Sequence, residues 1–200
     1  MRTPIFVSAV CVSALLLPSL ALTQEKKTTT NYLPLKVGNT WNYEVKAGGM
    51  EIAASQKVTK IEKKDGKDVA TIETTIAGQS INEQMSSTEK GIYRHSYQGV
   101  DVDPPILIMQ LPVKKGDTWT SKFKIMGQEL SASMKTEGEE KVTVPAGKYD
   151  AVVISMEMEL MGQKITSKSW FAPNVGIVKQ QFNLAGTEGT MELKEVKIEK

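Results

Sequence analysis

Cysteine and histidine are almost absent from this sequence of 200 residues, which contains one of each. With a single cysteine no disulfide can form within the chain, and one histidine cannot supply the several clustered ligands that a metal site needs. The sequence also lacks a Gly-x-Ser-x-Gly element and a glycine-rich phosphate loop. We therefore expect no metal, no cofactor and no catalytic residues, as in a protein that is not an enzyme.

A surplus of charge of one sign is also missing, since 25 basic residues face 23 acidic residues and the formal net charge is +2. The basic residues are almost all lysines, and they are spread among aspartates and glutamates. This pattern is typical of a solvated surface. No basic stripe indicates a nucleic acid or an anionic membrane as a partner.

One long apolar run is present, from Ile5 to Leu22, and it follows the single positive charge of Arg2. A charged start, a short apolar core and small residues after it are typical of a cleavable signal peptide, which we predict over residues 1–23. The protein is then periplasmic or extracellular, and its mature chain has no integral membrane segment. Cleavage after Ala21 or after Thr23 fits the sequence, and polar residues 24–31 are predicted to be a flexible leader.

Beyond the leader the chain alternates between apolar and polar residues, the period of half-buried strands. The clearest strand spans residues 152–160, where apolar side chains share one face and glutamates the other. Asp65-Gly66 predicts a tight hairpin turn, and residues 185–189 predict another. Residues 135–141 fit either a strand or a loop. Residues 106–112 are apolar and flanked by prolines, which predicts a buried extended segment that crosses or covers the sheet.

Two stretches of the chain match at a spacing of 78 residues, since Gly38-Asn39-Thr40-Trp41 corresponds to Gly116-Asp117-Thr118-Trp119. The match predicts two tandem β-meander repeats, at 32–100 and 113–200, joined by a linker at 101–112. The fold class is then a single all-β domain of residues 32–200 with roughly 10–12 antiparallel strands. It could be a curved sheet, a sandwich or a partly open barrel, and the repeats could share one sheet or pack face to face.

The strand at 152–160 carries Met156 and Met158, whereas the earlier copy has threonines and Glu73 at the corresponding place. Methionine is flexible and suits adaptable apolar cavities, although it also fills ordinary cores. If the protein binds an apolar ligand, the face of the strand at 152–160 is the first candidate. The candidate ligand-facing residues are Met134, Ile154, Met156, Met158 and Leu160.

Three further features admit a functional and a structural interpretation. Trp41, Trp119 and Trp170 would form a ligand platform, or Trp41 and Trp119, which occupy matching positions, would be paired core anchors. Glu157 and Glu159 share one strand face, as a carboxylate pair for hydrolysis or as ordinary solvated residues. His95 is expected on a sheet face without a metal.

Three segments of the chain form a pattern: Tyr32-Leu33-Pro34-Leu35-Lys36-Val37-Gly38-Asn39-Thr40-Trp41-Asn42-Tyr43, Val144-Pro145-Ala146-Gly147-Lys148-Tyr149 and Phe171-Ala172-Pro173-Asn174-Val175-Gly176-Ile177-Val178-Lys179. This pattern resembles that of uncharacterised exported bacterial β-rich proteins, written PLxxGNxWxY … VPAGxY … APxVGxVK. More distantly it is similar to periplasmic lipoprotein-carrier sheets, which hold acyl chains. The resemblance covers nearly the whole mature chain and implies a curved antiparallel sheet.

Taken together, these features predict an exported protein without enzymatic activity that binds an apolar ligand or a protein partner. The alternative is a structural or assembly component of the cell envelope. A hydrolase that uses carboxylates alone is a third hypothesis. The identity of the ligand or partner and the oligomeric state are left open by the sequence.

Overall fold

The computed structural model describes residues 30–199, and the predicted signal peptide lies outside them. Within this range the chain forms twelve strands and no helix. The strands are β1 (Thr40–Ala47), β2 (Met50–Lys64), β3 (Lys67–Ile76), β4 (Gln79–Thr88), β5 (Gly91–Tyr97), β6 (Val100–Gln110), β7 (Thr118–Ile125), β8 (Gln128–Val144), β9 (Gly147–Leu160), β10 (Gln163–Ala172), β11 (Gly176–Leu184) and β12 (Thr187–Lys197).

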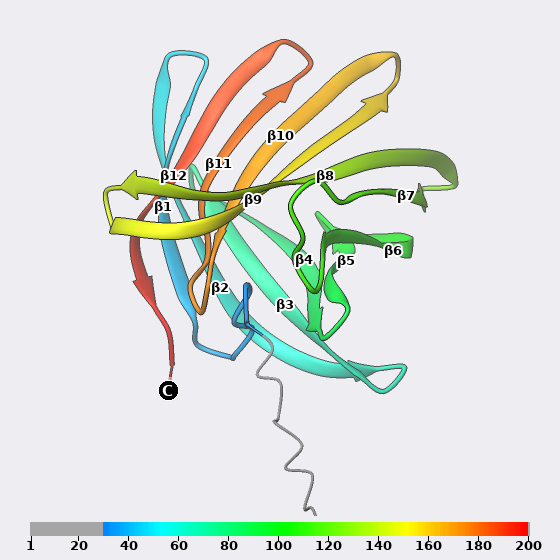
Figure 1. Ribbon diagram of the computed structural model, residues 1–200, viewed down its shortest axis with the longest axis horizontal. Coiled ribbons are helices and arrows are strands. Elements are labelled where there is room, and N and C mark those ends of the chain that lie inside the picture. The colour runs from blue at the N-terminus through cyan, green and yellow to red at the C-terminus, as the bar shows by residue number, and fades with distance from the viewer. Residues whose placement is uncertain (1–29, 200) are drawn as a thin grey trace, which may run out of the picture.

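Each strand pairs antiparallel with its neighbours in the chain, and β1 also pairs with β12 over eight residue pairs. This pairing closes the sheet into a barrel (Figure 1). The predicted all-β antiparallel fold is confirmed. The open curved sheet, the sandwich and the partly open barrel give way to a closed barrel, in which the first and last strands leave no unpaired edge.

Most hairpins turn through two residues, a non-glycine residue followed by glycine, and both residues have positive φ. This is the geometry of the tight turns that match the twist of paired strands. The predicted Asp65-Gly66 turn is one of them, with φ of 49° and 75°. The predicted turn at 185–189 is too long, because only Ala185 and Gly186 lie between β11 and β12.

The first strand shows how alternation builds the core. Trp41, Tyr43 and Val45 are buried, as their spacing predicts, and the residues between them are more exposed. The indole of Trp41 donates a hydrogen bond to the carbonyl of Val175 at 2.6 Å, and the hydroxyl of Tyr43 donates to the carbonyl of Ile177 at 2.9 Å. These two bonds tie β1 to the segment that begins β11 and satisfy polar atoms that burial would otherwise leave unpaired.

The strand predicted at 152–160 is part of β9, but its first half is buried on both faces. Ala151 and Val153 are as buried as Val152 and Ile154. The β8–β9 hairpin is long, and its turn lies against β12, where the amide of Ala146 donates to the carbonyl of Leu193 at 2.9 Å. Figure 1 shows this hairpin crossing in front of the neighbouring strands. This long-range contact was not visible in the local alternation.

The apolar segment at 106–112 does not cross or cover the sheet, so that interpretation is wrong. Residues up to Gln110 belong to β6, which is a strand of the barrel wall between β5 and β7. Its pairing with β7 covers only Val102 with Ile125 and Asp103 with Lys124. Beyond these two pairs, a side chain connects β7 to β6: the indole of Trp119 donates to the carbonyl of Leu107 at 2.8 Å. Residues 135–141, which fitted a strand or a loop, are strand β8.

The β1–β2 and β7–β8 hairpins have the same local geometry. In the first, the amide of Gly38 donates to the carbonyl of Val58, and in the second that of Gly116 donates to Thr136. Both partners are shifted by the same amount, because 116 − 38 = 78 and 136 − 58 = 78. The bulge also recurs, after Val58 in β2 and after Thr136 in β8. The two hairpins therefore share register, entry and irregularity.

Both ends of the described chain are fixed at one asparagine. The fully buried side chain of Asn39 donates to the carbonyl of Pro34 at 2.6 Å and accepts from the amide of Glu199 at 2.8 Å. Of the predicted flexible leader, residues 24–29 lie outside the description. Asn31 at its end is held, since its carbonyl accepts from the amide of Asn174 at 2.7 Å.

Candidate functional site

A cavity of about 1500 Å³ opens into the barrel and is lined by strands β1, β2 and β7–β12. At its centre is one row of residues that lie directly opposite one another from strand to strand. We call it the cavity row. Its members, in order, are Trp119, Met134, Met156, Ser167, Phe182, Gly189 and Ala47.

The cavity row faces the barrel interior. Residues directly opposite in antiparallel strands share a face of the sheet, and so do residues two apart along one strand. Val45, two residues from Ala47, and Ile154, two residues from Met156, are both buried in the core. The cavity is therefore a part of the interior that the side chains do not fill. None of the residues in the row has an ionisable side chain.

Gly189 is the member of the cavity row that has no side chain. It lies opposite Phe182, and a methyl group on Gly189 would overlap the Phe182 ring. The aromatic ring therefore covers the bare backbone of the glycine, an arrangement that protects a glycine within a sheet. Because only glycine leaves this space, a larger residue at position 189 would force the Phe182 ring to move.

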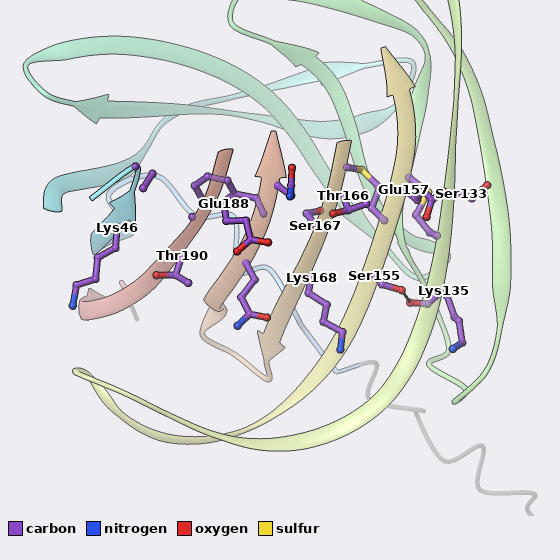
Figure 2. Close-up of a pocket in the computed structure, with 18 of the residues that line it drawn as sticks. Lys46, Ser133, Lys135, Ser155, Glu157, Thr166, Ser167, Lys168, Glu188 and Thr190 are labelled. Atoms are coloured by element: carbon purple, nitrogen blue, oxygen red, sulfur yellow. Dashed lines mark hydrogen bonds between the residues drawn. The ribbon is translucent and has the colours of Figure 1, made fainter. Parts of the chain in front are cut away.

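Polar residues flank the row on both sides along the strands, and Figure 2 shows them around the cavity. Several of their charges are neutralised by neighbours. Lys46 Nζ lies 2.6 Å from Glu44, and Lys135 Nζ lies 2.7 Å from Glu137. Hydrogen bonds from Lys46 and Lys194 lower the pKa of Glu44 to about 2, so this carboxylate stays ionised at any physiological pH. The surroundings of the cavity are polar but carry paired charge.

The five residues proposed from sequence do not lie together in the cavity. Met134 and Met156 line it, and they are direct partners across β8 and β9. Ile154 is buried in the core below them. Met158 pairs with Ala132 and Ile165, and Leu160 ends β9; both are half-buried and outside the lining.

Trp119 and Phe182 line the cavity as well, and sequence reasoning did not assign them to a site. Trp119 was considered as a core anchor or a platform because it matches Trp41. The two tryptophans differ in burial, since Trp41 is buried in the core and Trp119 is half-buried in the cavity lining. Phe182 lay in a predicted strand, and the correct length of the following turn would have placed it opposite Gly189.

The other candidate groups have ordinary surroundings. Glu157 pairs with Lys164 at 2.8 Å on an exposed part of the sheet. His95 is half-buried on β5, and its Nε2 is 2.8 Å from the hydroxyl of the fully buried Ser86. Burial, with help from Lys64 and Lys67, lowers the pKa of His95. Among residues 30–199 no three acidic, histidine or cysteine residues are grouped so as to hold a metal ion.

The chain belongs to the DUF3108-like family, whose family model matches residues 25–189. It is similar to the crystal structure of a predicted lipoprotein from Parabacteroides distasonis, at a TM-score of 0.54 and 16% identity over 84% of this chain and 99% of that one. It is similar to a predicted exported protein with a YmcC-like fold from Bacteroides fragilis, at a TM-score of 0.51 and 16% identity over 84% of this chain and 100% of that one. At this identity the likeness concerns the fold. No curated protein matches the chain.

Proposed function

We propose that this protein is exported to the cell envelope and holds an apolar ligand in the cavity of its barrel, without catalysing a reaction. The observation that carries the proposal is the cavity row, which presents Trp119, Met134, Met156 and Phe182 to an open space of about 1500 Å³. This volume exceeds the roughly 300–1,000 Å³ of most small-molecule pockets, so it has room for a ligand of lipid size.

The chemistry of the row favours an uncharged hydrocarbon body. Each Å² of apolar ligand surface removed from water contributes about 25 cal/mol, whereas an ionised group at the row would meet no opposite charge there. Methionine side chains adapt to ligands of different shape, which suits a flexible chain. Within the row itself, the hydroxyl of Ser167 is the group that could contact a polar end of the ligand, because the polar residues next to the row members along the strands face the outer side of the sheet.

Export is supported by two observations of different kinds. The N-terminal sequence has the charged start and apolar core of a signal peptide. The two similar structures are described as a lipoprotein and as an exported protein. The resemblance to periplasmic lipoprotein-carrier sheets is consistent with an apolar ligand in the same compartment. Finding the protein in the cytoplasm of its own host, by fractionation, would contradict export.

Ligand binding can be tested with a neutral apolar dye, phenylnaphthylamine, displaced by a long-chain alcohol. We expect the dye to bind and Met156→Lys to weaken binding by about tenfold or more, because a charge then lies in the cavity row. Ser55→Lys is the matched control: Ser55 is exposed on β2 outside the lining, so binding should not change.

A parent protein that does not bind the dye would overturn the proposal. Equal binding by Met156→Lys and the parent would do the same, because it would place the dye elsewhere. Urea unfolding of both variants establishes that each is folded at the temperature of the binding measurement.

We also infer that the barrel arose by duplication of a β-meander of six strands. The support is the geometry shared by the β1–β2 and β7–β8 hairpins, with the same register, glycine entry and bulge 78 residues apart. On this proposal the two repeats share one sheet, the first with β1–β6 and the second with β7–β12, so the linker predicted at 101–112 is mostly strand β6. The second repeat contributes most of the cavity row.

A further inference from the structure

Large apolar side chains are exposed mainly at one end of the barrel. In an antiparallel meander alternate turns lie at the same end, so the hairpins β1–β2, β7–β8, β9–β10 and β11–β12 all turn there. Each carries one exposed large apolar residue at or beside its turn. We call them the tip residues: Met50, Met126, Met161 and Leu184. Of the other exposed residues of this kind in the described range, Tyr97 lies beside the β5–β6 turn at the same end but outside the cavity lining, and Val37 and Ile61 lie toward the other end of the barrel.

Two tip residues are methionines at turn positions whose backbone conformation does not favour methionine. Met126 and Met161 are 86% and 83% exposed, and each has a φ near +50° as the first residue of a tight turn before glycine. Asparagine, aspartate and glycine tolerate that conformation best, as Asp65 illustrates in the turn between β2 and β3 at the opposite end. Neither turn geometry nor core packing accounts for a methionine at these positions.

The four hairpins are neighbours around the barrel, since the strand order runs β2-β1-β12-β11-β10-β9-β8-β7. Figure 1 shows three of them side by side along the upper edge, β1–β2, β11–β12 and β9–β10, with β7–β8 at the right. The same eight strands line the cavity, and Met50 belongs both to the tips and to the cavity lining. The exposed apolar tips thus surround the strands that carry the proposed binding site.

The charges beside the tips limit what can cover them. Lys46 is 3.8 Å from Glu51, Lys124 is 3.1 Å from Glu129, and Lys164 is 2.8 Å from Glu157. Because these lysines are paired and the acidic residues Glu159 and Glu188 also lie beside the tips, the end of the barrel has no surplus of positive charge that would attract an acidic partner. Its attraction is for an apolar phase.

The spacing of the tip residues indicates which kind of apolar partner can cover them. Adjacent hairpins are two strands apart, so neighbouring tips are separated by roughly 10 Å. A protein partner needs a continuous complementary surface of roughly 800 Å² on each side, whereas the interfacial region of a bilayer accommodates separate apolar side chains.

We propose that this end of the barrel docks on a lipid bilayer, with Met50, Met126, Met161 and Leu184 entering the interfacial region. The purpose of docking rests on the proposed function, because docking would bring the cavity close to the source of its apolar ligand. The contact itself is independent of the ligand and can be measured separately.

Flotation with phosphatidylcholine vesicles tests the docking, using protein recovered from the export compartment of an expressing cell. The variant carries Met50→Ser, Met126→Asn, Met161→Asn and Leu184→Ser. Asparagine before glycine suits both turns, so the variant should fold. We expect its partition to vesicles to fall by at least about tenfold, because four apolar side chains no longer enter the interface.

The matched control replaces exposed apolar residues away from the tips, Val37→Ser with Ile61→Ser, and should float like the parent. Because residues 1–29 are identical in all variants, any difference reports on the substituted side chains. Flotation should also persist in high salt and without anionic lipid, since the charges beside the tips are paired.

Three results would overturn the docking: a parent that does not float, a tip variant that floats like the parent, or flotation that requires anionic lipid at low salt. Dye binding in solution without vesicles is measured on the same proteins. Retained dye binding with failed flotation removes only the docking, whereas flotation without dye binding removes only the cavity function.

Discussion

The β1–β2 and β7–β8 hairpins share one geometry and serve different purposes. Both begin with a glycine of positive φ, Gly38 and Gly116, and both place a tryptophan three residues later. Trp41 is 2% exposed and belongs to the packed core. Trp119 is half-buried and lines the cavity. The same residue in the same local structure is an anchor in one hairpin and part of a candidate site in the other.

The two tryptophans differ in their neighbouring strands and in their depth within the barrel. β1 pairs with β12 over eight residue pairs, and its tryptophan bonds to Val175 near the start of β11. β7 pairs with β6 through two residue pairs only, and Trp119 reaches across this short seam to Leu107. The cavity row contains Trp119 but meets β1 at Ala47, six residues beyond Trp41, so the two tryptophans lie at different depths in the interior.

Replacing the two tryptophans should give the largest contrast. Trp41→Ala should lower the free energy of unfolding by about 3–5 kcal/mol, because it leaves a large hole in a closed core. Trp119→Ala should cost about 1–2 kcal/mol, because part of its surface is already exposed to water, but it should weaken dye binding. Urea unfolding and dye titration of both variants measure the two effects. Equal destabilisation by the two substitutions would mean that Trp119 is a core residue like its counterpart.

Asn39 and Asp117, which lie between the glycine and the threonine of the two hairpins, should give a smaller contrast in stability. Asn39→Asp should cost about 2 kcal/mol or more, since a carboxylate cannot donate to the carbonyl of Pro34 and remains charged and buried. Asp117→Asn, the exchange at the matching position, should change stability by less than about 0.5 kcal/mol, because Asp117 is only partly buried. Urea unfolding at neutral pH decides between these values. Similar costs at both positions would show that the side chain of Asp117 is as constrained as that of Asn39.

Much of this fold follows from local patterns. Alternation located the strands, and the burial of Trp41, Tyr43 and Val45 in β1 agrees with it. Closure of the barrel could not be predicted, because a strand alternates in the same way in an open sheet and in a closed one. The prolines around residues 106–112 disfavoured a helix and the apolar side chains suggested a segment across the sheet, yet β6 stays in the wall with few bonds to β7.

Only part of the candidate site could be predicted from the sequence. Met134 and Met156 stand on the inner face of their strands, and alternation was enough to select them. The same reasoning selected Ile154, because a strand pattern gives the face of a residue but not the depth at which the interior fills. Phe182 and Gly189 become partners only through the register across a two-residue turn, which the sequence interpretation had extended to Gly189.

The smallest expected effect concerns the histidine in the first half and its counterpart in the second. β5 and β11 both begin with glycine, Gly91 and Gly176, at a spacing of 176 − 91 = 85. At this spacing His95 corresponds to Gln180, since 95 + 85 = 180. Each contacts a buried serine on the preceding strand: His95 is 2.8 Å from the hydroxyl of Ser86, and the amide of Gln180 donates to Ser169 at 3.1 Å. The second half thus fills the equivalent position with a side chain that does not titrate.

This correspondence predicts a pH dependence confined to the first half. Burial lowers the pKa of His95 in the folded state below 6.5, its ordinary value, so the folded state favours the neutral ring. The stability is then fully present above pH 6.5 and declines as the pH falls from 6.5 through the lowered pKa, because the unfolded chain takes up the proton first. His95→Gln should flatten this decline while keeping a hydrogen-bonding partner for Ser86. Urea unfolding of both proteins between pH 7.5 and 5 measures it, and identical slopes would assign the acid sensitivity to carboxylates shared by both halves.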